Sequence, residues 1–335
     1  MRADGLREPL RQRLSEVAGP DVDAALALAA DLTELVPNPA GGDTAQRWAL
    51  LSALATRDLT TARVAEAHLD AVAILQEAGA AEDLIGTTWG VFAAEGPGVA
   101  LTATATSPDV WRLDGVKPWC SLAGRLSHAL VTARVGDQRR LFAVALQQPG
   151  VVVQPGAWHS RGLTDVPSGP VAFDDVPARP VGEAGWYLTR PGFAHGGIGV
   201  AACWYGGAVG VALALYRAAS AREPDQIARW HLGAVDLDLH TAELALDAAA
   251  VQVDAGLADG TAGQLLAVRT RSTVAAAAER VLGRVGHALG PAPLALDADH
   301  ARRVADLTVY LRQHHAERDV AALGEQLLSA GRAPW

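Results

Sequence analysis

The sequence predicts an α+β fold with an N-terminal helical domain, a middle antiparallel β-barrel or β-sandwich domain and a C-terminal four-helix bundle. Three patterns along the chain predict this fold. Apolar residues recur at helical spacing up to about residue 82, short alternating segments occupy about 84 to 185, and long helical patterns return after about 188. The expected domains are therefore residues 1–83, 84–186 and 187–335.

Four helices are expected in the first domain. Leu6, Leu10 and Leu14 recur at helical spacing in the first of them. The second runs from about 22 to 36 and ends at a break rich in Pro and Gly over residues 37–43. Short polar residues that can cap a helix precede the remaining two, namely Asp43 or Thr44 for the third and Asp58, Thr60 or Thr61 for the fourth.

The middle domain is expected to consist of short strands. Alternating segments predict strands at 87–92, 99–104, 130–135, 141–144, 151–153 and 171–173. Turn residues separate these segments at short intervals, and no long helical period interrupts them. This regular spacing is typical of an antiparallel barrel or sandwich.

The last domain is expected to contain four long helices, at about 192–220, 225–256, 262–288 and 299–329. The main interruption is Gly286 to Pro293, where two prolines and two glycines cannot continue a helix. One stretch, Gly196 to Tyr216, carries no charge and is long enough to cross a bilayer. Because it stands alone and is rich in Gly and Ala, we expect a buried core helix rather than a membrane span.

Composition limits the classes of function. Apolar residues make up 50% of the 335 residues and charged residues 19%, so the chain is expected to fold. The formal net charge of −9 argues against a general nucleic-acid binder. Two cysteines cannot form a disulfide framework and the charged N-terminus does not look like a signal peptide, so a cytoplasmic location is expected. The spacing of His and carboxylate residues predicts no metal site.

The stretch from Asp114 to Ser121 is the most informative motif. Asp114-Gly115 is a turn signal, and Trp119-Cys120-Ser121 would place a large ring and a hydroxyl on one short piece of strand. An apolar plate beside a hydrogen-bonding group suits a planar heteroaromatic cofactor, of which flavin is the obvious candidate. The alternative is a hairpin in which the Trp is a core residue.

Three segments, in this order and spacing, resemble the acyl-CoA dehydrogenase superfamily of FAD flavoproteins, and the resemblance covers nearly the whole chain. They are Trp111 to Ser121 with the strand through Arg134, then Val171 to Pro177 with Val181-Gly182, and finally Gly199 to Ala202 with Gly206. The resemblance implies an FAD cofactor, an acyl-CoA or carrier-bound acyl substrate, and a homodimer or homotetramer.

The resemblance also implies roles for individual residues. Trp119 occupies the place of a Trp that packs near the flavin, and Ser121 that of a Thr whose hydroxyl bonds the isoalloxazine edge. Glu95 lies in what looks like a shortened form of the family's loop over the flavin. Since that loop has lost its Ser-Asp end here, Thr102 or Thr104 is a candidate to compensate.

The C-terminal part departs from the family pattern. His287 stands where relatives carry a Gln that contacts the FAD of a partner subunit, and Gly290 is the retained first glycine of the following pair. The family's Arg-x-x-Phe-Gly motif, which holds the FAD diphosphate, is absent. Counting on from Asp306, His314 takes the position of the common catalytic Glu, so it is the candidate base. The alternative is that His314 lies on the polar face of one continuous helix over 299–328.

Three functions remain open at this stage. The first is α,β-dehydrogenation of an acyl thioester by an FAD-dependent oxidoreductase of the acyl-CoA dehydrogenase type. The second is a reduced-flavin-dependent monooxygenase on the same scaffold. The third is a non-catalytic relative that has lost FAD, because the diphosphate contacts and the catalytic Glu are missing. The sequence favours the first.

Overall fold

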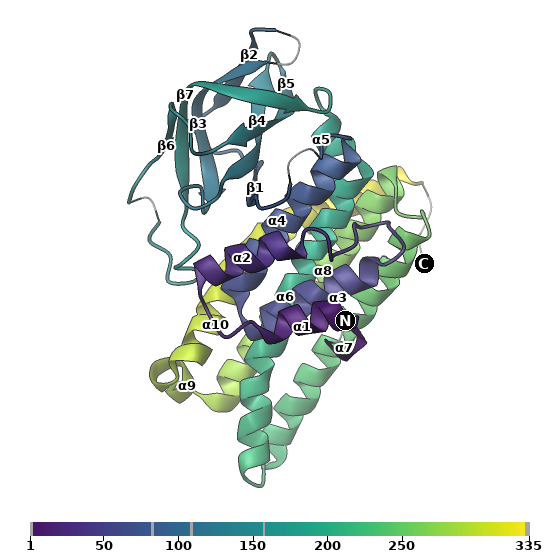
Figure 1. The fold of residues 1–335 in the computed structure, drawn as a ribbon. Helices are drawn as coiled ribbons and strands as arrows, with labels where there is room; N and C mark the ends of the chain where they lie inside the picture. The colour runs from purple at the N-terminus through teal and green to yellow at the C-terminus, as the bar shows by residue number, and fades with distance from the viewer. Residues whose placement is uncertain (1–2, 82–83, 108–109, 157, 332–335) are drawn as a thin grey trace.

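The computed structural model describes residues 3–81, 84–107, 110–156 and 158–331, and it confirms the predicted α+β fold. Helices come first, a β domain follows, and long helices complete the chain, with the β domain seated at one end of the helical body (Figure 1). Apolar side chains from all three parts pack into one continuous core. The cavity described below lies where the three parts meet.

The N-terminal part contains the four expected helices after a short 3-10 turn, η1 (Ala3–Gly5). They are α1 (Glu8–Ser15), α2 (Val22–Leu32), α3 (Thr44–Arg57) and α4 (Leu59–Glu77). Of the proposed caps, Asp58 is formed, since it accepts a hydrogen bond from the amide of Thr61. Asp21, which was not proposed, caps α2 by accepting hydrogen bonds from the amides of Asp23 and Ala24. Asp43 precedes α3 but its side chain makes no capping hydrogen bond.

The described residues of the β domain form seven strands. They are β1 (Trp89–Phe92), β2 (Leu101–Ala105), β3 (Trp111–Ser121), β4 (His128–Val135), β5 (Gln138–Ala145), β6 (Val151–Val153) and β7 (Ser168–Val181). The pairings β4–β2, β2–β3, β3–β7, β7–β5 and β5–β4 return to their starting strand, so the sheet closes into a barrel. The barrel is not wholly antiparallel as predicted, because β4 pairs in parallel with β1 and with β2.

The predicted turn at Asp114-Gly115 is wrong. Both residues lie inside the continuous strand β3, at a bulge in its pairing with β7. Gly115 has φ +121°, and a Cβ there would lie 2.2 Å from the carbonyl oxygen of Ala100. The Asp-Gly pair therefore supplies the backbone freedom of a bulge rather than that of a hairpin turn.

The C-terminal part begins with the short α5 (Trp186–Thr189) and continues with α6 (Pro191–Ala221), α7 (Gln226–Asp254) and α8 (Gly260–Leu289). The break after α8 leads to α9 (Ala292–Leu296) and α10 (Ala298–Tyr310). The predicted fourth long helix is interrupted: η2 (Leu311–Gln313) and a turn with Ala316 at φ +51° separate α10 from α11 (Glu317–Ser329). The alternative of one continuous helix over 299–328 is therefore wrong.

The apolar helix α6 is the core helix of the bundle. It is long and apolar enough to cross a membrane, but 72% of its most apolar window is buried inside the protein. Its glycines permit close packing on α3, since a Cβ at Gly206 would lie 2.0 Å from the carbonyl oxygen of Ser52. Burial against other helices accounts for the uncharged stretch without a bilayer.

Candidate functional site

A cavity of about 700 Å³ opens where the three parts of the chain meet. Most of the residues that line it come from four regions of the chain, and Tyr187 on α5 and Ser168 on β7 also contribute. From α4 they are Arg63, Glu66, Ala67 and Asp70; from β1, β3 and the loop after β1 they include Val91, Glu95, Trp119 and Ser121; from the segment between β6 and β7 they include Trp158, Ser160, Leu163 and Val166; and from α10 and the loop after it they include Tyr310, Arg312, Gln313 and His315.

Trp119 is not a core residue. Its side chain is 58% exposed and lines the cavity, although it belongs to the end of strand β3. Its backbone adopts the left-handed conformation, with φ +61°. A bulky residue in this region costs about 1–3 kcal/mol, and such strain clusters at sites where a side chain has to be presented to a ligand. The fold therefore presents a large flat ring to the cavity at some cost in stability.

Ser121 and Glu95 lie in the same cavity. The Ser121 hydroxyl is 2.8 Å from that of Ser168 on β7, and Arg63 Nη2 lies 3.4 Å from its oxygen. Glu95 accepts a 2.9 Å hydrogen bond from the ammonium of Lys117, which is itself buried in the barrel. Burial lowers the pKa of Lys117, and the bond to Glu95 opposes that shift. The buried ammonium group of Lys117 thus fixes the position of the Glu95 carboxylate.

Three other sequence-predicted residues lie elsewhere. Thr102 is exposed on β2 and donates a hydrogen bond to the carbonyl oxygen of Asp114. His287 and Gly290 lie at the C-terminal end of α8, where the ring of His287 is 6.5 Å from that of His231. None of the three lines the cavity within this chain.

His314 lies in the turn between η2 and α11, and its ring is directed toward Ser272 in the bundle. Its Nε2 lies 3.0 Å from the Ser272 hydroxyl on α8, and its Nδ1 accepts a hydrogen bond from the amide of Ala316. Burial lowers the pKa of His314, although nearby Asp319 opposes the shift. The residues on either side of it, Gln313 and His315, line the cavity instead.

Sequence reasoning missed the charged face that α4 presents to the cavity. Arg63 donates a 2.7 Å hydrogen bond to Glu66, and the Tyr310 hydroxyl donates a 3.1 Å bond to the same carboxylate oxygen. One turn on, Asp70 lies 3.9 Å from Arg190 Nη2. Burial raises the pKa of both carboxyl groups, Glu66 and Asp70. The spacing i, i+3, i+7 on an otherwise apolar helix is the signal that could have found this face.

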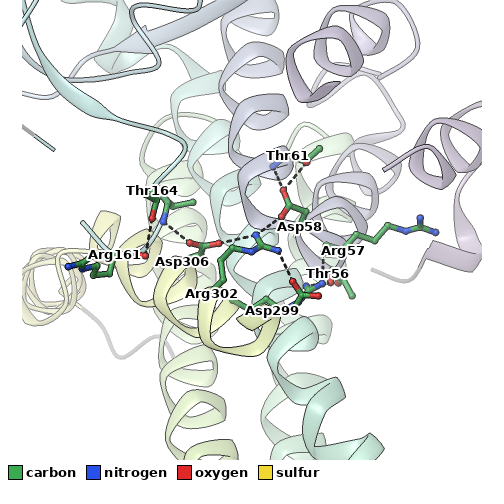
Figure 2. A network of polar contacts seen from close by, with 11 residues as sticks. Thr56, Arg57, Asp58, Thr61, Arg161, Thr164, Asp299, Arg302 and Asp306 are labelled. Carbon is green, nitrogen blue, oxygen red and sulfur yellow. Dashed lines mark hydrogen bonds and ion pairs between the residues drawn. The ribbon is translucent and has the colours of Figure 1, made fainter. Parts of the chain in front are cut away.

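A buried ion network fixes the part of the wall between β6 and β7. Figure 2 shows Arg302 on α10 between Asp58 and Asp306, with Nη1 2.7 Å from the first carboxylate and 3.4 Å from the second. Asp306 in turn accepts a 2.6 Å hydrogen bond from the backbone amide of Leu163. A Cβ at Gly162 would lie 2.0 Å from the carbonyl oxygen of Ala305, so this segment sits directly on α10. Arg302 thus links the start of α4 to α10, and Asp306 links α10 to the cavity wall at Leu163.

Comparison with known proteins identifies the fold. No protein-family model matches the chain, and no curated protein matches it in sequence. Solved structures match over nearly the whole chain. KijD3 in complex with FMN and dTDP-3-amino-2,3,6-trideoxy-4-keto-3-methyl-D-glucose is 20% identical, with a TM-score of 0.78 over 97% of this chain and 92% of KijD3.

Two further solved structures match the chain over most of its length. Butyryl-CoA dehydrogenase from Megasphaera elsdenii is 17% identical, with a TM-score of 0.78 over 90% of each chain. TdsC from Paenibacillus sp. A11-2, solved with FMN and indole, is 14% identical, with a TM-score of 0.79 over 98% of each chain. The chain has the fold of the acyl-CoA dehydrogenase-like flavoproteins, and the predicted resemblance is confirmed at the level of the fold.

Proposed function

We propose that the protein is a flavin-dependent oxidoreductase and that the isoalloxazine ring lies in the cavity between the β-barrel and the bundle. The observation that carries this proposal is Trp119, an exposed ring held at a strained backbone position on the cavity wall. Ser121 and Glu95 supply hydrogen-bonding groups beside it. A flavin supplies an aromatic surface that would cover the Trp119 ring, and FMN and FAD share that part of the molecule.

A flavin spectrum tests this proposal. Protein purified with its cofactor, or titrated with FMN and FAD, is expected to bind one flavin per chain with a shifted absorbance band. The Trp119→Ala variant is expected to weaken flavin binding by about tenfold, because it loses a stacking surface worth roughly 1 kcal/mol or more. An Ile85→Ala variant, altered at an exposed apolar side chain that does not line the cavity, is the control. Absence of flavin binding in the unmodified protein would leave the non-catalytic alternative.

Between the two reactions left open by the sequence, the site favours monooxygenation with reduced flavin. The loop after α10 presents Gln313 and His315 to the cavity, and no carboxylate, at the place where the family resemblance puts the dehydrogenase base. Glu66 on the facing wall already accepts hydrogen bonds from Arg63 and Tyr310. Burial raises the pKa of Glu66, but this carboxylate lies on α4 and not in the loop to which the resemblance assigns the dehydrogenase base.

The chain's own residues then have definite tasks. When bound and reduced, a flavin supplies the two electrons with which dioxygen is divided between the substrate and water. His315 Nδ1 lies 3.2 Å from Asp319, which leaves its Nε2 as the ring atom that can exchange a proton with a ligand in the cavity. Arg63, Glu66 and Tyr310 form a fixed polar wall that orients the substrate.

Dehydrogenation of an acyl thioester is the second candidate, because carboxylates do line the cavity and burial raises the pKa of Asp70 toward the range of a useful base. In this reaction His314 would also be a candidate base, which requires its ring to turn away from Ser272. Anaerobic mixing with butyryl-CoA separates the two. Bleaching of the flavin by the thioester alone supports dehydrogenation, whereas turnover that needs an external reductant and dioxygen supports monooxygenation.

The size of the flavin depends on a second copy of the chain. In the family resemblance, FAD reaches a partner subunit at the positions of His287 and Gly290, and these residues lie outside the cavity of their own chain. We propose FAD if two copies assemble so that this end of α8 approaches the partner's cavity, and FMN otherwise. Mass spectrometry of the flavin released by denaturation distinguishes the two cofactors.

We propose that the chain forms a homodimer or homotetramer through an interface on the outer face of α7. Five large apolar side chains on that helix are between 55% and 70% exposed, and the last four of them recur every seven residues; they are Ile227, Trp230, Leu237, Leu244 and Val251. A stripe of this period matches a second helix of the same kind. Light scattering is expected to report an oligomer for the unmodified chain and a smaller species for Leu237→Lys, with Ile85→Lys, at another exposed site, as control.

A further inference from the structure

The wall that α4 contributes to the cavity is mostly charged, whereas apolar side chains such as Leu163 and Val166 line other parts of it. Of the residues that α4 contributes, only Ala67 is uncharged, and the loop after α10 adds Arg312, Gln313 and His315. Placing an alkyl chain against ionised side chains removes them from water without any compensating hydrogen bond. The wall is therefore built for a ligand that makes hydrogen bonds at its buried end.

The carboxylates of this wall differ in what they already bind. Glu66 accepts from both Arg63 and Tyr310 through the same oxygen. Glu95 accepts from Lys117. Among the residues that the structure describes, no hydrogen bond reaches Asp70, and its nearest cationic atom is Arg190 Nη2 at 3.9 Å.

The surroundings of Asp70 are arranged to keep its carboxylate in place. A Cβ on Gly196 of α6 would lie 2.5 Å from Asp70 Oδ1, so the glycine makes room for the carboxylate. Arg190 is anchored elsewhere, through a 2.6 Å ion pair with Glu77, and does not fold onto Asp70. The side chain of Asp70 is 21% exposed; it lines this cavity and also a smaller pocket beside Arg190 and Glu77.

We infer that Asp70 is the specificity-determining residue of the cavity and that it accepts a hydrogen bond from an amino or hydroxyl group at the buried end of a polar substrate. This inference rests on the proposed function and names its substrate class: small molecules that carry amino or hydroxyl groups, in place of alkyl chains. A site built to accept from such a donor rejects the analogue that lacks it, because the carboxylate is then left without a partner.

Three ring compounds of nearly equal size test the inference. Cyclohexylamine and cyclohexanol both donate a hydrogen bond, whereas cyclohexanone only accepts. Binding is measured as the shift in the thermal unfolding midpoint and as Kd from tryptophan fluorescence, with and without bound flavin. The amine and the alcohol are expected to bind about tenfold more tightly than the ketone to the unmodified protein, as one hydrogen bond to a charged group predicts.

Two variants at Asp70 make the test specific. Asp70→Asn replaces the charged acceptor with an amide that both accepts and donates, so the preference over the ketone is expected to shrink for both the amine and the alcohol. Asp70→Ala removes the acceptor, so the three compounds are expected to bind alike. Arg190 keeps its partner Glu77 in both variants, and folding is therefore expected to survive. Asp236→Asn, at an exposed position on α7, is the matched control.

The result that overturns the inference is independent of the redox activity. If the ketone binds the unmodified protein as tightly as the amine and the alcohol, or if the order of affinities survives in Asp70→Ala, Asp70 does not select the substrate. Both measurements work on flavin-free protein, so a failure to turn over any substrate affects only the proposed reaction.

Discussion

Removing the carboxylate of Asp306 tests whether the ion network of Figure 2 holds the cavity wall. The side chain is 2% exposed, and it accepts a 2.6 Å hydrogen bond from the amide of Leu163. Losing a hydrogen bond to a charged acceptor and leaving the amide without a partner costs about 3 kcal/mol. Arg302 keeps its 2.7 Å ion pair with Asp58, so the remaining network adds little to this cost. We expect Asp306→Ala to lower the free energy of unfolding in urea by about 3 kcal/mol.

The same arginine offers a control on its other side. Asp299 Oδ1 lies 3.8 Å from Arg302 Nη2, but its side chain is 80% exposed. An exposed pair of this kind contributes less than about 1 kcal/mol, so Asp299→Ala is expected to change stability little. Asp306→Asn keeps an acceptor for Leu163 and is expected to fall between the two. Equal effects of Asp299→Ala and Asp306→Ala on stability would refute the reasoning.

Three further outcomes follow from buried or strained groups. Burial lowers the pKa of His68 from its ordinary 6.5 to about 4, so protonation of this ring favours the unfolded chain. The contribution of neutral His68 to the free energy of unfolding is therefore fully present above about pH 6.5. It falls by about 2 kcal/mol between pH 8 and pH 5. Urea titrations over that range check this, and His68→Gln is expected to flatten the curve. Trp119→Gly is expected to raise the free energy of unfolding by about 1 kcal/mol while weakening flavin binding, because glycine tolerates the left-handed backbone; lower stability would contradict the assignment of strain. Gly206→Ala is expected to lower the thermal midpoint strongly, since its Cβ would meet a backbone oxygen at 2.0 Å, whereas Gly233→Ala, with nothing within 4 Å, is expected to raise it slightly.

The periodic parts of the fold could be predicted from the sequence, and the exceptions have local causes. Helices α6, α7 and α8 begin and end within a few residues of their predicted limits, because apolar residues that recur at helical spacing over a long segment predict a helix reliably. The interruption after Tyr310 left no such mark: residues 311–316 contain no Gly or Pro, and the turn there depends on Ala316 adopting a positive φ. Asp114-Gly115 is a sequence typical of a turn, but here it forms a β-bulge. The bulge depends on how β3 pairs with β7, which the local sequence does not specify.

The candidate site could be predicted only where its residues are close together in the chain. The spacing of Trp119 and Ser121 within one strand was enough to place a ring and a hydroxyl side by side, and both line the cavity. The partners that complete the polar wall come from positions far apart: Glu66 meets Tyr310 across 244 residues. Such a meeting depends on how α10 crosses α4, and no local pattern encodes it.

The two histidines after α10 show how a shift of one residue changes the chemistry of a site. Alignment by counting places His314 at the position of the family base, but the 3-10 turn and the positive φ of Ala316 rotate its ring toward Ser272 and leave His315 in the cavity. The helix breaks at this point. Counting residues along an unbroken helix therefore cannot predict which of the two side chains faces the cavity. Under the proposed function, acid–base chemistry at this wall depends on Glu66 and Asp70 of α4 and on His315 of the turn after η2, so two backbone segments place these groups around one cavity. That arrangement suits a substrate held at several polar atoms better than one held by a single carboxylate at a thioester.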